Sequence, residues 1–500
     1  MTSIPVGSLW LKNKFNITGV SLTHCSYIGN NDSIEISNKG NIDQVYSRKY
    51  SPVEDTPLSH LEFSLKYDDL SLAFLRKIFD YIPIQDIERF IASSPAGKYS
   101  RKIGFFFEML TGNKLAIKSS IGGNYVDLLE NEKYVTGTVI KNTRWRVNDN
   151  LLGTDLYCPI VRKTNKLKEL LKDDIRARLE QLKTDFSPAV FNRAINYLYN
   201  KETRSSYEIE KEQPTPDRME KFVALLTQAG AEESELLLDE KRLTHLQNAI
   251  VDNRFWAQGY RDFQNYIGQT LPDYMDMIHY ICPPPVFVRS MMKGLVNVAN
   301  KTSKVPAEVR AAIISFGFVF IHPFEDGNGR IHRFLIHDIL VHDKVVPKGL
   351  IIPVSAHMLS NMRDYDAGLE RYSKPIMQVI KYAKNRDGEL EVLNKEEVEA
   401  FYRFPDLTEQ CIYLTETIHA TLKEDMPEEL LFIERYDEVK RALQDIVDMP
   451  DRHINLMVLF LHQNKGVFPK RRREQFSKLT DGEIGKMETE YRRIFELDKL

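Results

Sequence analysis

Apolar residues recur at helical spacing in the first third of the chain. The spacing predicts three helices, over residues 70–82, 84–92 and 102–110. Pro83 separates the first two, because proline interrupts a helix. Residues before position 70 lack this period and carry turn-forming Asn, Gly and Pro, so we expect short β elements or irregular structure there. Residues 122–161 are typical of a loop-rich insert or a small hairpin.

The remaining chain is patterned almost entirely as helix. Two helices are predicted over residues 163–200 with a break near Ser187-Pro188, and a long helical stretch follows from about 217 to 384. Within it, residues 260–285 contain Gly268, Pro272 and a run of three prolines, which favours a hairpin or a loop. Residues 389–500 are charged and helical, with a break at Met449-Pro450.

These patterns predict a mainly α protein of three domains. We place a mixed α+β N-terminal domain over residues 1–162, a helical core over 163–385 and a helical accessory domain over 386–500. A winged helix is one interpretation of the last domain. The four residues Lys470-Arg471-Arg472-Arg473 would then be candidates for contact with nucleic acid, although such a short run is more typical of a solvated face.

Composition and charge narrow the class of protein. The chain has 500 residues, 42% hydrophobic and 28% charged, with a net charge of -3, so no overall charge favours nucleic acid or an acidic membrane. Its four cysteines stand far apart, as in a reducing compartment. The first residues do not resemble a signal peptide, and the most apolar stretch, 311–321, is too short to cross a bilayer. We expect a cytoplasmic protein without membrane segments.

The candidate chemistry lies in one stretch, Ile321-His322-Pro323-Phe324-Glu325-Asp326-Gly327-Asn328-Gly329-Arg330-Ile331-His332-Arg333. An apolar helix over residues 311–321 precedes the histidine. Pro323 disfavours helical geometry at His322, so we expect His322 where a buried helix ends and a loop begins.

The glycines of this stretch predict an anion site. Gly327, Asn328 and Gly329 tolerate positive φ, and a second helix begins near Gly329. Free N–H groups and the dipole at a helix N-terminus favour an anion. Arg330 and Arg333 lie three residues apart on one helix face, which suggests a polyphosphate, and Asp326 could hold a bridging Mg²⁺.

A plain helix–loop–helix corner, with a capping aspartate and a core histidine, is the alternative. It would be preferred for an isolated Gly-Asn-Gly, but here a base, a carboxylate, an anion turn and two arginines fall together. The stretch resembles the Fic (Fido) family motif, His-Pro-Phe-x-(Asp/Glu)-Gly-Asn-Gly-Arg-x-x-Arg, at every fixed position. The resemblance implies a Fic helical core with a β-hairpin flap, and a protein adenylyltransferase that moves AMP from ATP to a protein hydroxyl.

The resemblance also assigns roles within the stretch. His322 would deprotonate the target hydroxyl, and Asp326 would coordinate Mg²⁺. ATP and its phosphates would be bound by Phe324, Gly327, Asn328, Gly329, Arg330 and Arg333, with Arg333 at the far end of the phosphates. Downstream, Tyr365 stands where relatives often carry a tyrosine pair near the nucleotide, although only one of the pair is present.

An upstream segment is similar to the inhibitory motif of the family, (Ser/Thr)-x-x-x-Glu-(Gly/Asn). Ser206 and Glu210 match it, and they share one face if the segment is helical. The resemblance implies a Glu210–Arg333 pair that blocks the γ-phosphate. Lys211 departs from the motif, because it stands where Gly or Asn is usual, and it weakens or reshapes the expected inhibition. Read without the family, the segment is a charged, solvated helix.

Residues 260–268 and 279–285 resemble the family flap and the proline turn after it. In the family the flap docks the target by strand addition, which would assign target docking to Ile278, His279 and Tyr280. A plain surface hairpin is the other interpretation. His332, His337 and His342 are spaced by five, which turns them away from one another and argues against a metal site.

Three functional readings therefore stay open. The first is AMP transfer from ATP with Mg²⁺ to a protein substrate, which could be the chain itself. The second is a Fic enzyme that removes AMP or uses another donor. The third, of another class, is a nucleic-acid-binding regulator acting through the C-terminal domain, against which the charge balance argues. A homo-oligomer is compatible with all three.

Overall fold

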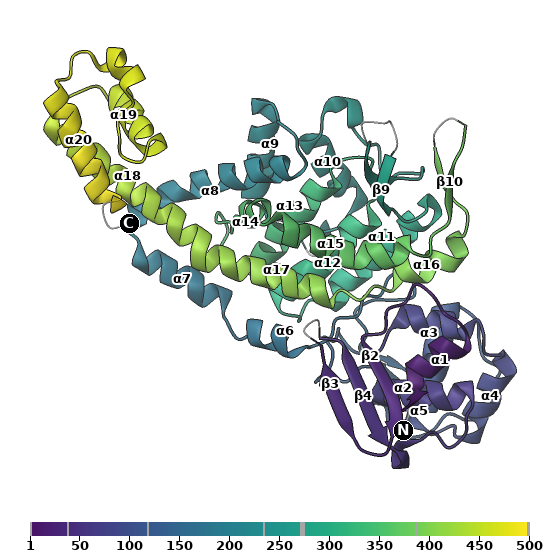
Figure 1. Ribbon diagram of the computed structural model, residues 1–500. Helices are drawn as coiled ribbons and strands as arrows, with labels where there is room; N and C mark the ends of the chain where they lie inside the picture. The colour runs from purple at the N-terminus through teal and green to yellow at the C-terminus, as the bar shows by residue number, and fades with distance from the viewer. Residues whose placement is uncertain are drawn as a thin grey trace. The chain divides into compact units, whose positions relative to one another are not determined.

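The computed structural model describes residues 3–37, 40–117, 120–233, 236–270, 276–386 and 389–497. The chain divides into two compact units, Met1–Asp174 with Glu202–Ile418, and Ile175–Lys201 with His419–Leu500. Helices dominate both units, as the sequence pattern predicts (Figure 1). The three-domain boundaries drawn from the sequence stay a prediction. In the described ranges, no helix combines the length and hydropathy that crossing a bilayer requires.

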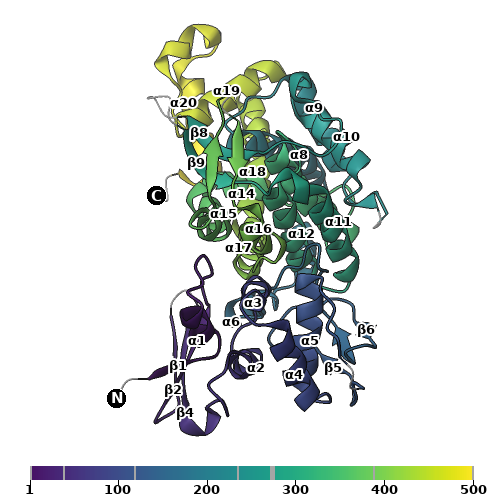
Figure 2. The ribbon, with the colours of Figure 1, turned by 90° about the vertical axis from the view of Figure 1, so that its right-hand side faces the viewer.

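A small mixed sheet begins the first unit. Its order is β1 (Ile4–Val6), β2 (His24–Gly29), β4 (Ile42–Ser47) and β3 (Ser33–Ile36), with β2 and β4 parallel. Helices α1 (Gly7–Lys14) and α2 (Pro57–Tyr67) pack together beside this sheet, as Figure 2 shows. Val6, Tyr46 and Phe63 form the shared core. The expected β elements before residue 70 are therefore present.

Three helices and a second sheet complete the N-terminal part. The helices are α3 (Leu72–Phe79), α4 (Ile84–Ser93) and α5 (Lys98–Thr111), close to the three that the apolar spacing predicts. Ser71 caps α3 through its side chain, and Gly112, at φ 74°, ends α5 in the left-handed conformation. Residues 122–161 form a hairpin with a third strand, in the order β5 (Val126–Asp127), β7 (Val147–Asp149) and β6 (Ile140–Asn142).

The helical core of the first unit is built around α12 (Ala307–Ile321), in which every residue is buried. α13 (Asn328–His342) packs along it, joined by the loop that carries the motif. Around this pair lie α9 (Pro216–Thr227), α10 (Glu240–Ile250), α11 (Pro285–Lys301), α14 (Val354–Ser360), α15 (Met362–Met377), α16 (Lys395–Arg403) and α17 (Thr408–Ala420), with the short α6 (Asn165–Leu170) further upstream.

Two hairpins interrupt the helical core. The predicted one is present as β8 (Tyr266–Thr270) and β9 (Asp276–Ile281), antiparallel with a register shift between Ile267 and Gly268. The other, β10 (Tyr382–Lys384) with β11 (Leu390–Val392), was not predicted, because its three-residue strands are too short to give a period of two.

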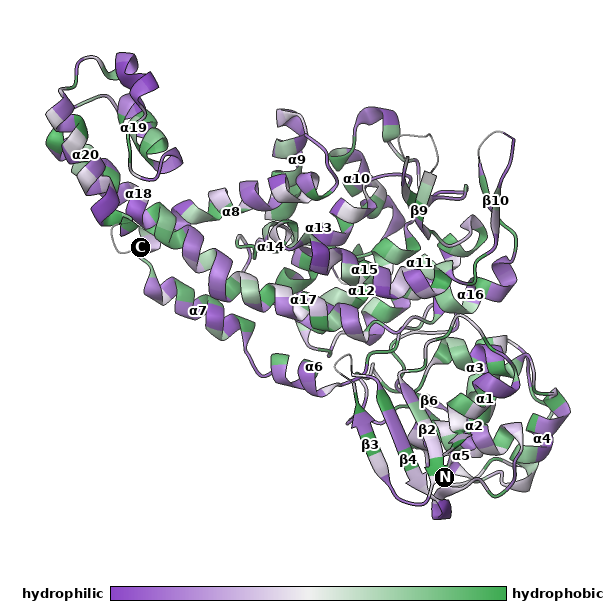
Figure 3. Cartoon of the chain, viewed as in Figure 1, coloured by the Kyte–Doolittle hydropathy of each residue, from purple (hydrophilic) through white to green (hydrophobic). Residues whose placement is uncertain are grey.

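The second unit consists of helices. It contains α7 (Ile175–Asp185), the start of α8 (Pro188–Ile209), a π-helical turn (Thr421–Asp425), α18 (Met426–Ile446), α19 (Asp451–Gln463), a 3₁₀ turn (Lys470–Phe476) and α20 (Asp481–Ile494). Hydrophilic and hydrophobic residues alternate along α18 (Figure 3), whose buried Val439 and Leu443 join a core with α19 and α20. The predicted breaks near Pro188 and Pro450 are confirmed.

The described part of this region does not support a winged helix. Between residues 393 and 497 the structure has no β-strand, so the two-stranded wing is missing there. Two arginines of the basic run also make contacts within the fold. Arg473 donates to the carbonyls of Phe476 and Leu479, and Arg472 lies 5.2 Å from the ring centre of Phe460.

Candidate active site

The candidate base, His322, lies where α12 ends. Its backbone is left-handed, at φ 53° and ψ 60°, and its N–H still bonds to Phe318 O at 2.9 Å. The break predicted from Pro323 is confirmed. The ring Nδ1 lies 3.1 Å from Val319 O, so in the neutral ring Nδ1–H donates to that carbonyl and Nε2 keeps a free lone pair.

The surroundings of His322 favour its neutral form. Burial lowers its pKa to about 4, and the positive charge of Arg261 acts in the same direction. The Val319 hydrogen bond and the carboxylates of Glu210 and Asp326 oppose this shift only in part. The imidazole is therefore unprotonated at neutral pH, which a general base requires.

The anion turn has one left-handed residue. Gly327 has φ 86°, and a Cβ there would lie 2.9 Å from Val251 Cγ1, so both conformation and space call for glycine. Asn328 and Gly329 already belong to the first turn of α13, so within this run the left-handed conformation is confined to Gly327. Their N–H groups are those that a helix N-terminus leaves free for an anion.

Two motif residues support the loop through buried side chains. Asn328 accepts from Phe324 N–H at 3.0 Å and donates to Phe324 O at 2.9 Å. The Phe324 ring is fully buried, beside the rings of Tyr260 and Phe318. The side chains of Asn328 and Phe324 thus fix the shape of the loop, and the backbone N–H of Asn328 is the group left for the phosphate contact that the family resemblance predicts.

Arg330 and Arg333 are both fully buried on the expected face of α13. Arg333 donates from Nε to Ser206 Oγ at 2.8 Å and from Nη2 to Ser206 O at 2.7 Å, and its Nη2 lies 2.8 Å from Glu210 Oε1. Burial lowers the pKa of Arg333, but the charge and hydrogen bonds of its partners, Glu210 first, outweigh burial and leave that pKa raised. Tyr365 Oη is 3.5 Å from Nη1 of the same guanidinium, so the residue expected near adenosine contacts an arginine here.

The Glu210 carboxylate lies beside Gly329, at the start of α13. A Cβ on Gly329 would fall 2.1 Å from Glu210 Oε1, so glycine at this position leaves the space that the carboxylate fills. The predicted Glu210–Arg333 ion pair is thus present, and it sets a negative group against the N-terminus of α13.

Lys211 adopts the conformation that glycine would adopt at this position. Its φ is 58°, and α8 ends there with Lys211 N–H on Glu208 O at 2.9 Å and Glu212 N–H on Tyr207 O at 3.1 Å. These two bonds define a Schellman turn with lysine in place of the usual glycine. The departure from the motif therefore leaves the helix end in place, at a conformational cost of roughly 1 kcal/mol.

The end of α8 is fixed on α13 by further contacts. Glu202, Ser206 and Glu210 are spaced by four along one face of α8. Glu202 is buried, lies 2.7 Å from His337 Nε2 and accepts from Ser355 N–H at 2.8 Å. The sequence alone does not reveal this contact, because nothing local distinguishes Glu202 from the exposed glutamates near it.

Arg261 is a second residue that sequence reasoning missed. It is 5% exposed, and each of its guanidinium nitrogens donates at 2.7 Å to a different carbonyl, those of His322, Phe263 and Pro283. Its own N–H bonds to Pro323 O at 2.8 Å. Arg261 therefore joins the segment that leads into the β8–β9 hairpin to the backbone of His322.

The hairpin residues expected to dock a target have different surroundings. Tyr280 is buried and its hydroxyl donates to Phe320 O at 2.7 Å, so its side chain anchors β9 on α12. Ile278 is half-buried and His279 is exposed. Of the three, His279 is the side chain most open to a partner.

Asp326 could act as a single carboxylate ligand of a metal ion. Its Oδ1 accepts from Arg330 Nη2 at 2.7 Å and from Gly327 N–H at 2.6 Å, while its side chain is 39% exposed. Mg²⁺ in phosphate sites commonly takes one or two carboxylates together with phosphate oxygens and water. Across the described ranges no group of three or more His, Cys, Asp and Glu side chains gathers as a metal site.

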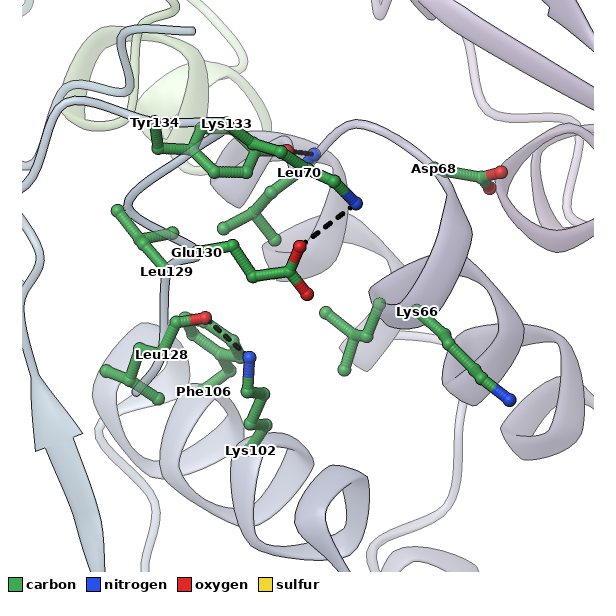
Figure 4. Close-up of a pocket in the computed structure, with 11 residues that line it drawn as sticks. Lys66, Asp68, Leu70, Lys102, Phe106, Leu128, Leu129, Glu130, Lys133 and Tyr134 are labelled. Atoms are coloured by element: carbon green, nitrogen blue, oxygen red, sulfur yellow. Dashed lines mark hydrogen bonds and ion pairs between the residues drawn. The ribbon is translucent and has the colours of Figure 1, made fainter. Parts of the chain in front are cut away.

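A separate cavity lies in the N-terminal part of the first unit (Figure 4). Burial lowers the pKa of Lys102 to about 8, and its ammonium donates to Leu128 O at 2.8 Å. Lys133 pairs with Glu130 at 3.1 Å. Asp68, which also lines the cavity, instead accepts from Ser8 N–H and from the Ser26 hydroxyl outside it, and no motif residue is part of the lining.

Comparison with known protein families identifies the core. Residues 237–340 match the model of the Fic/DOC family. The chain therefore contains a Fic domain, with the motif loop and both of its helices almost entirely inside the matched range.

Curated relatives carry a common description. A probable protein adenylyltransferase of Aquifex aeolicus is 26% identical over 30% of this chain and 50% of its own length. A protein adenylyltransferase of Caenorhabditis elegans is 34% identical over 19% of this chain and 16% of its own. The chain thus spans half the length, or less, of these two relatives.

Solved structures with similarity also include Fic proteins. A Fic family protein from Desulfovibrio desulfuricans is 17% identical, with a TM-score of 0.38, over 57% of this chain and 82% of that one. A Fic domain-containing signalling protein from Bacteroides thetaiotaomicron is 16% identical, with a TM-score of 0.33, over 53% of this chain and 98% of that one.

Proposed function

We propose that this protein transfers AMP from ATP to a hydroxyl group of a protein, with His322 as general base. The observation that carries the proposal is the imidazole of His322, whose Nδ1 bonds to Val319 O and leaves Nε2 free, at the start of the loop that leads into α13 and its two buried arginines. The adenylyltransferase descriptions of both curated relatives support the same reaction. ATP and a protein substrate are thus the expected partners.

In the proposed reaction, Nε2 of His322 takes the proton of the target hydroxyl. The hydroxyl oxygen then forms a bond to the α-phosphorus, and the bond from that phosphorus to the bridging oxygen breaks, which releases pyrophosphate. Reactions of this kind depend on positioning and charge neutralisation more than on covalent help from the enzyme. The free N–H groups of α13 and the two arginines would supply these for the phosphates. Mg²⁺ held by Asp326 would neutralise further phosphate charge.

The resting protein would be inhibited by its own Glu210. The carboxylate lies against the anion turn and on Arg333, so a triphosphate and Glu210 compete for the same positive groups. Removing Glu210 would free Arg333 for the last phosphate. Competition between an internal group and a ligand typically changes affinity by about 5–150-fold.

The first experiment follows label from ATP into protein. With α-labelled ATP, we expect transfer by wild type and about tenfold more by Glu210→Gly, which removes the competing carboxylate. With γ-labelled ATP we expect no transfer, because pyrophosphate leaves. Gel separation of labelled protein gives both results.

Two outcomes would contradict the proposal in different ways. Label from the γ-position would indicate phosphate transfer. Absence of label with either donor, together with loss of label from protein modified beforehand, would indicate removal of AMP. Glu210 would face the same site in AMP transfer and in AMP removal, so its substitution is expected to change the rate of either reaction.

Replacing Lys211 by glycine is expected to lower basal transfer by wild-type protein. The left-handed turn at Lys211 holds Glu210 in place, and glycine stabilises such a turn by about 1 kcal/mol, a factor of roughly five. Initial rates of wild type and Lys211→Gly test this. Lys344→Gly is a matched control, because Lys344 is also left-handed, at φ 60°, but lies beyond α13. Equal basal rates in wild type and Lys211→Gly would show that the turn at Lys211 does not contribute to inhibition by Glu210.

A further inference from the structure

The other arginine of the motif is also held by a carboxylate. Arg330 Nη1 donates to Glu212 Oε2 at 2.9 Å, and Arg330 Nη2 lies 2.9 Å from Glu212 Oε1. Arg218 holds the same carboxylate, with Nη2 at 2.8 Å from Oε2. Neither Glu212 nor Arg218 belongs to the motifs that the sequence matches.

These groups form a compact structure around Tyr207. The guanidinium of Arg218 lies 5.1 Å and that of Arg330 5.2 Å from the centre of the Tyr207 ring. Tyr207 Oη, Arg218 Nε and Arg330 Nη1 all donate to Ile250 O. Arg330 is fully buried, and among its described contacts Nε is the nitrogen without an acceptor. Asp326 Oδ1 also holds Arg330 Nη2, at 2.7 Å, but Glu212 contacts both Nη1 and Nη2, so a phosphate can bind Arg330 through both nitrogens only after Glu212 has left it.

Glu210 and Glu212 lie on the same turn. They flank the left-handed Lys211, whose own side chain is exposed, and each pairs with one of the two arginines. Arg330 is three residues, or about 4.5 Å along α13, closer to the anion turn than Arg333. A polyphosphate that starts on the turn therefore reaches Arg330 before Arg333.

We propose that Glu212 is a second nucleotide-discriminating residue, which keeps Arg330 from the middle phosphate of a bound nucleotide. The inference rests on the proposed nucleotide site and extends it. Glu210 then controls the affinity for a third phosphate, and Glu212 controls the affinity for a second. One turn thus carries two separable contacts, each of which opposes a different part of the polyphosphate.

Calorimetric binding of AMP, ADP and ATP with Mg²⁺ separates the two contacts. The full chain carries His322→Ala throughout, so that no turnover occurs. We expect Glu212→Gln to bind ADP about tenfold more tightly and AMP as before. We expect Glu210→Gly to tighten ATP only, and the double variant to tighten ATP more than either single one. Glu208→Gln is the matched control, because Glu208 is exposed on the same turn.

Unchanged or weaker ADP binding by Glu212→Gln, in a variant that melts like its parent, would overturn the inference. If that variant does not fold, Glu212→Asp keeps the charge but is one methylene too short for Arg330, and the same tightening of ADP is expected. Nucleotide binding is measured in the inactive His322→Ala chain and AMP transfer in the active one, so the role of Glu212 and the proposed reaction are tested separately. Tighter ADP with no AMP transfer leaves Glu212 as described and refutes the reaction, whereas AMP transfer with unchanged ADP affinity refutes the role of Glu212 alone.

Discussion

Replacing His322 by alanine is expected to lower the rate of AMP transfer by about 10²–10⁴-fold, the usual contribution of a placed general base. The reason is geometric. Nδ1–H is held by Val319 O, so Nε2 is the nitrogen that can take a proton, and alanine removes it. The left-handed backbone at position 322 also tolerates alanine less well than glycine, so His322→Gly is run as a second variant.

Initial rates with α-labelled ATP measure the effect best in Glu210→Gly, where the starting rate is highest. His245→Ala is the control, since His245 is an exposed histidine on α10. ATP affinity should not change in either histidine variant, because neither side chain holds the phosphates. If the His322 variants lost AMP transfer because they no longer bound ATP, His322 would not be the general base.

The pH profile gives an independent test of the same residue. The pKa of His322 is lowered to about 4, so the base stays unprotonated above that pH, and activity is lost as the pH falls through it. An ordinary imidazole, with a pKa near 6.5, would lose about tenfold in kcat/KM between pH 7.5 and 5.5. We expect less than twofold over that interval in Glu210→Gly. A tenfold fall would show a base that titrates normally.

The parts of the site that the sequence predicts are those built by neighbours in the chain. The end of α12 at His322 follows from Pro323, and the start of α13 follows from the Gly-Asn-Gly run. The Glu210–Arg333 pair could be predicted only through the family resemblance. Its partners lie 123 residues apart, a separation at which no pattern of spacing operates.

The contacts of the site that the sequence does not predict are made between segments that lie far apart in the chain. Glu212 differs in no local way from Glu208, yet the turn at Lys211 sends one to Arg330 and leaves the other exposed. The same limit applies to the short β10–β11 hairpin, where three-residue strands give no readable period. Physical reasoning from the chain alone finds motifs and helix ends, but it cannot assign partners to single buried charges.

Arg261 is the clearest case, and its replacement by methionine is the second large effect that we expect. Methionine keeps much of the buried volume but leaves the carbonyls of His322, Phe263 and Pro283 without their donor. Each buried acceptor left unpaired costs about 1–3 kcal/mol, so we expect the first unit to lose several kcal/mol of stability. Scanning calorimetry measures this loss. Arg289→Met is the control, because Arg289 is exposed and its pair with Glu240 contributes little.

Activity should fall as well, because Arg261 acts on the backbone that carries the base. A displacement of about 1 Å in a reacting group can cost on the order of 10² in rate. We therefore expect kcat of Arg261→Met to fall by about that factor at a temperature where the variant is folded, with KM for ATP nearly unchanged, since Arg261 does not contact the anion turn. Arg261→Lys restores one donor nitrogen in place of three, which cannot reach all three carbonyls, and should recover only part of kcat. If kcat and ATP binding instead fell together, in proportion to the unfolded fraction, Arg261 would support the fold without positioning His322.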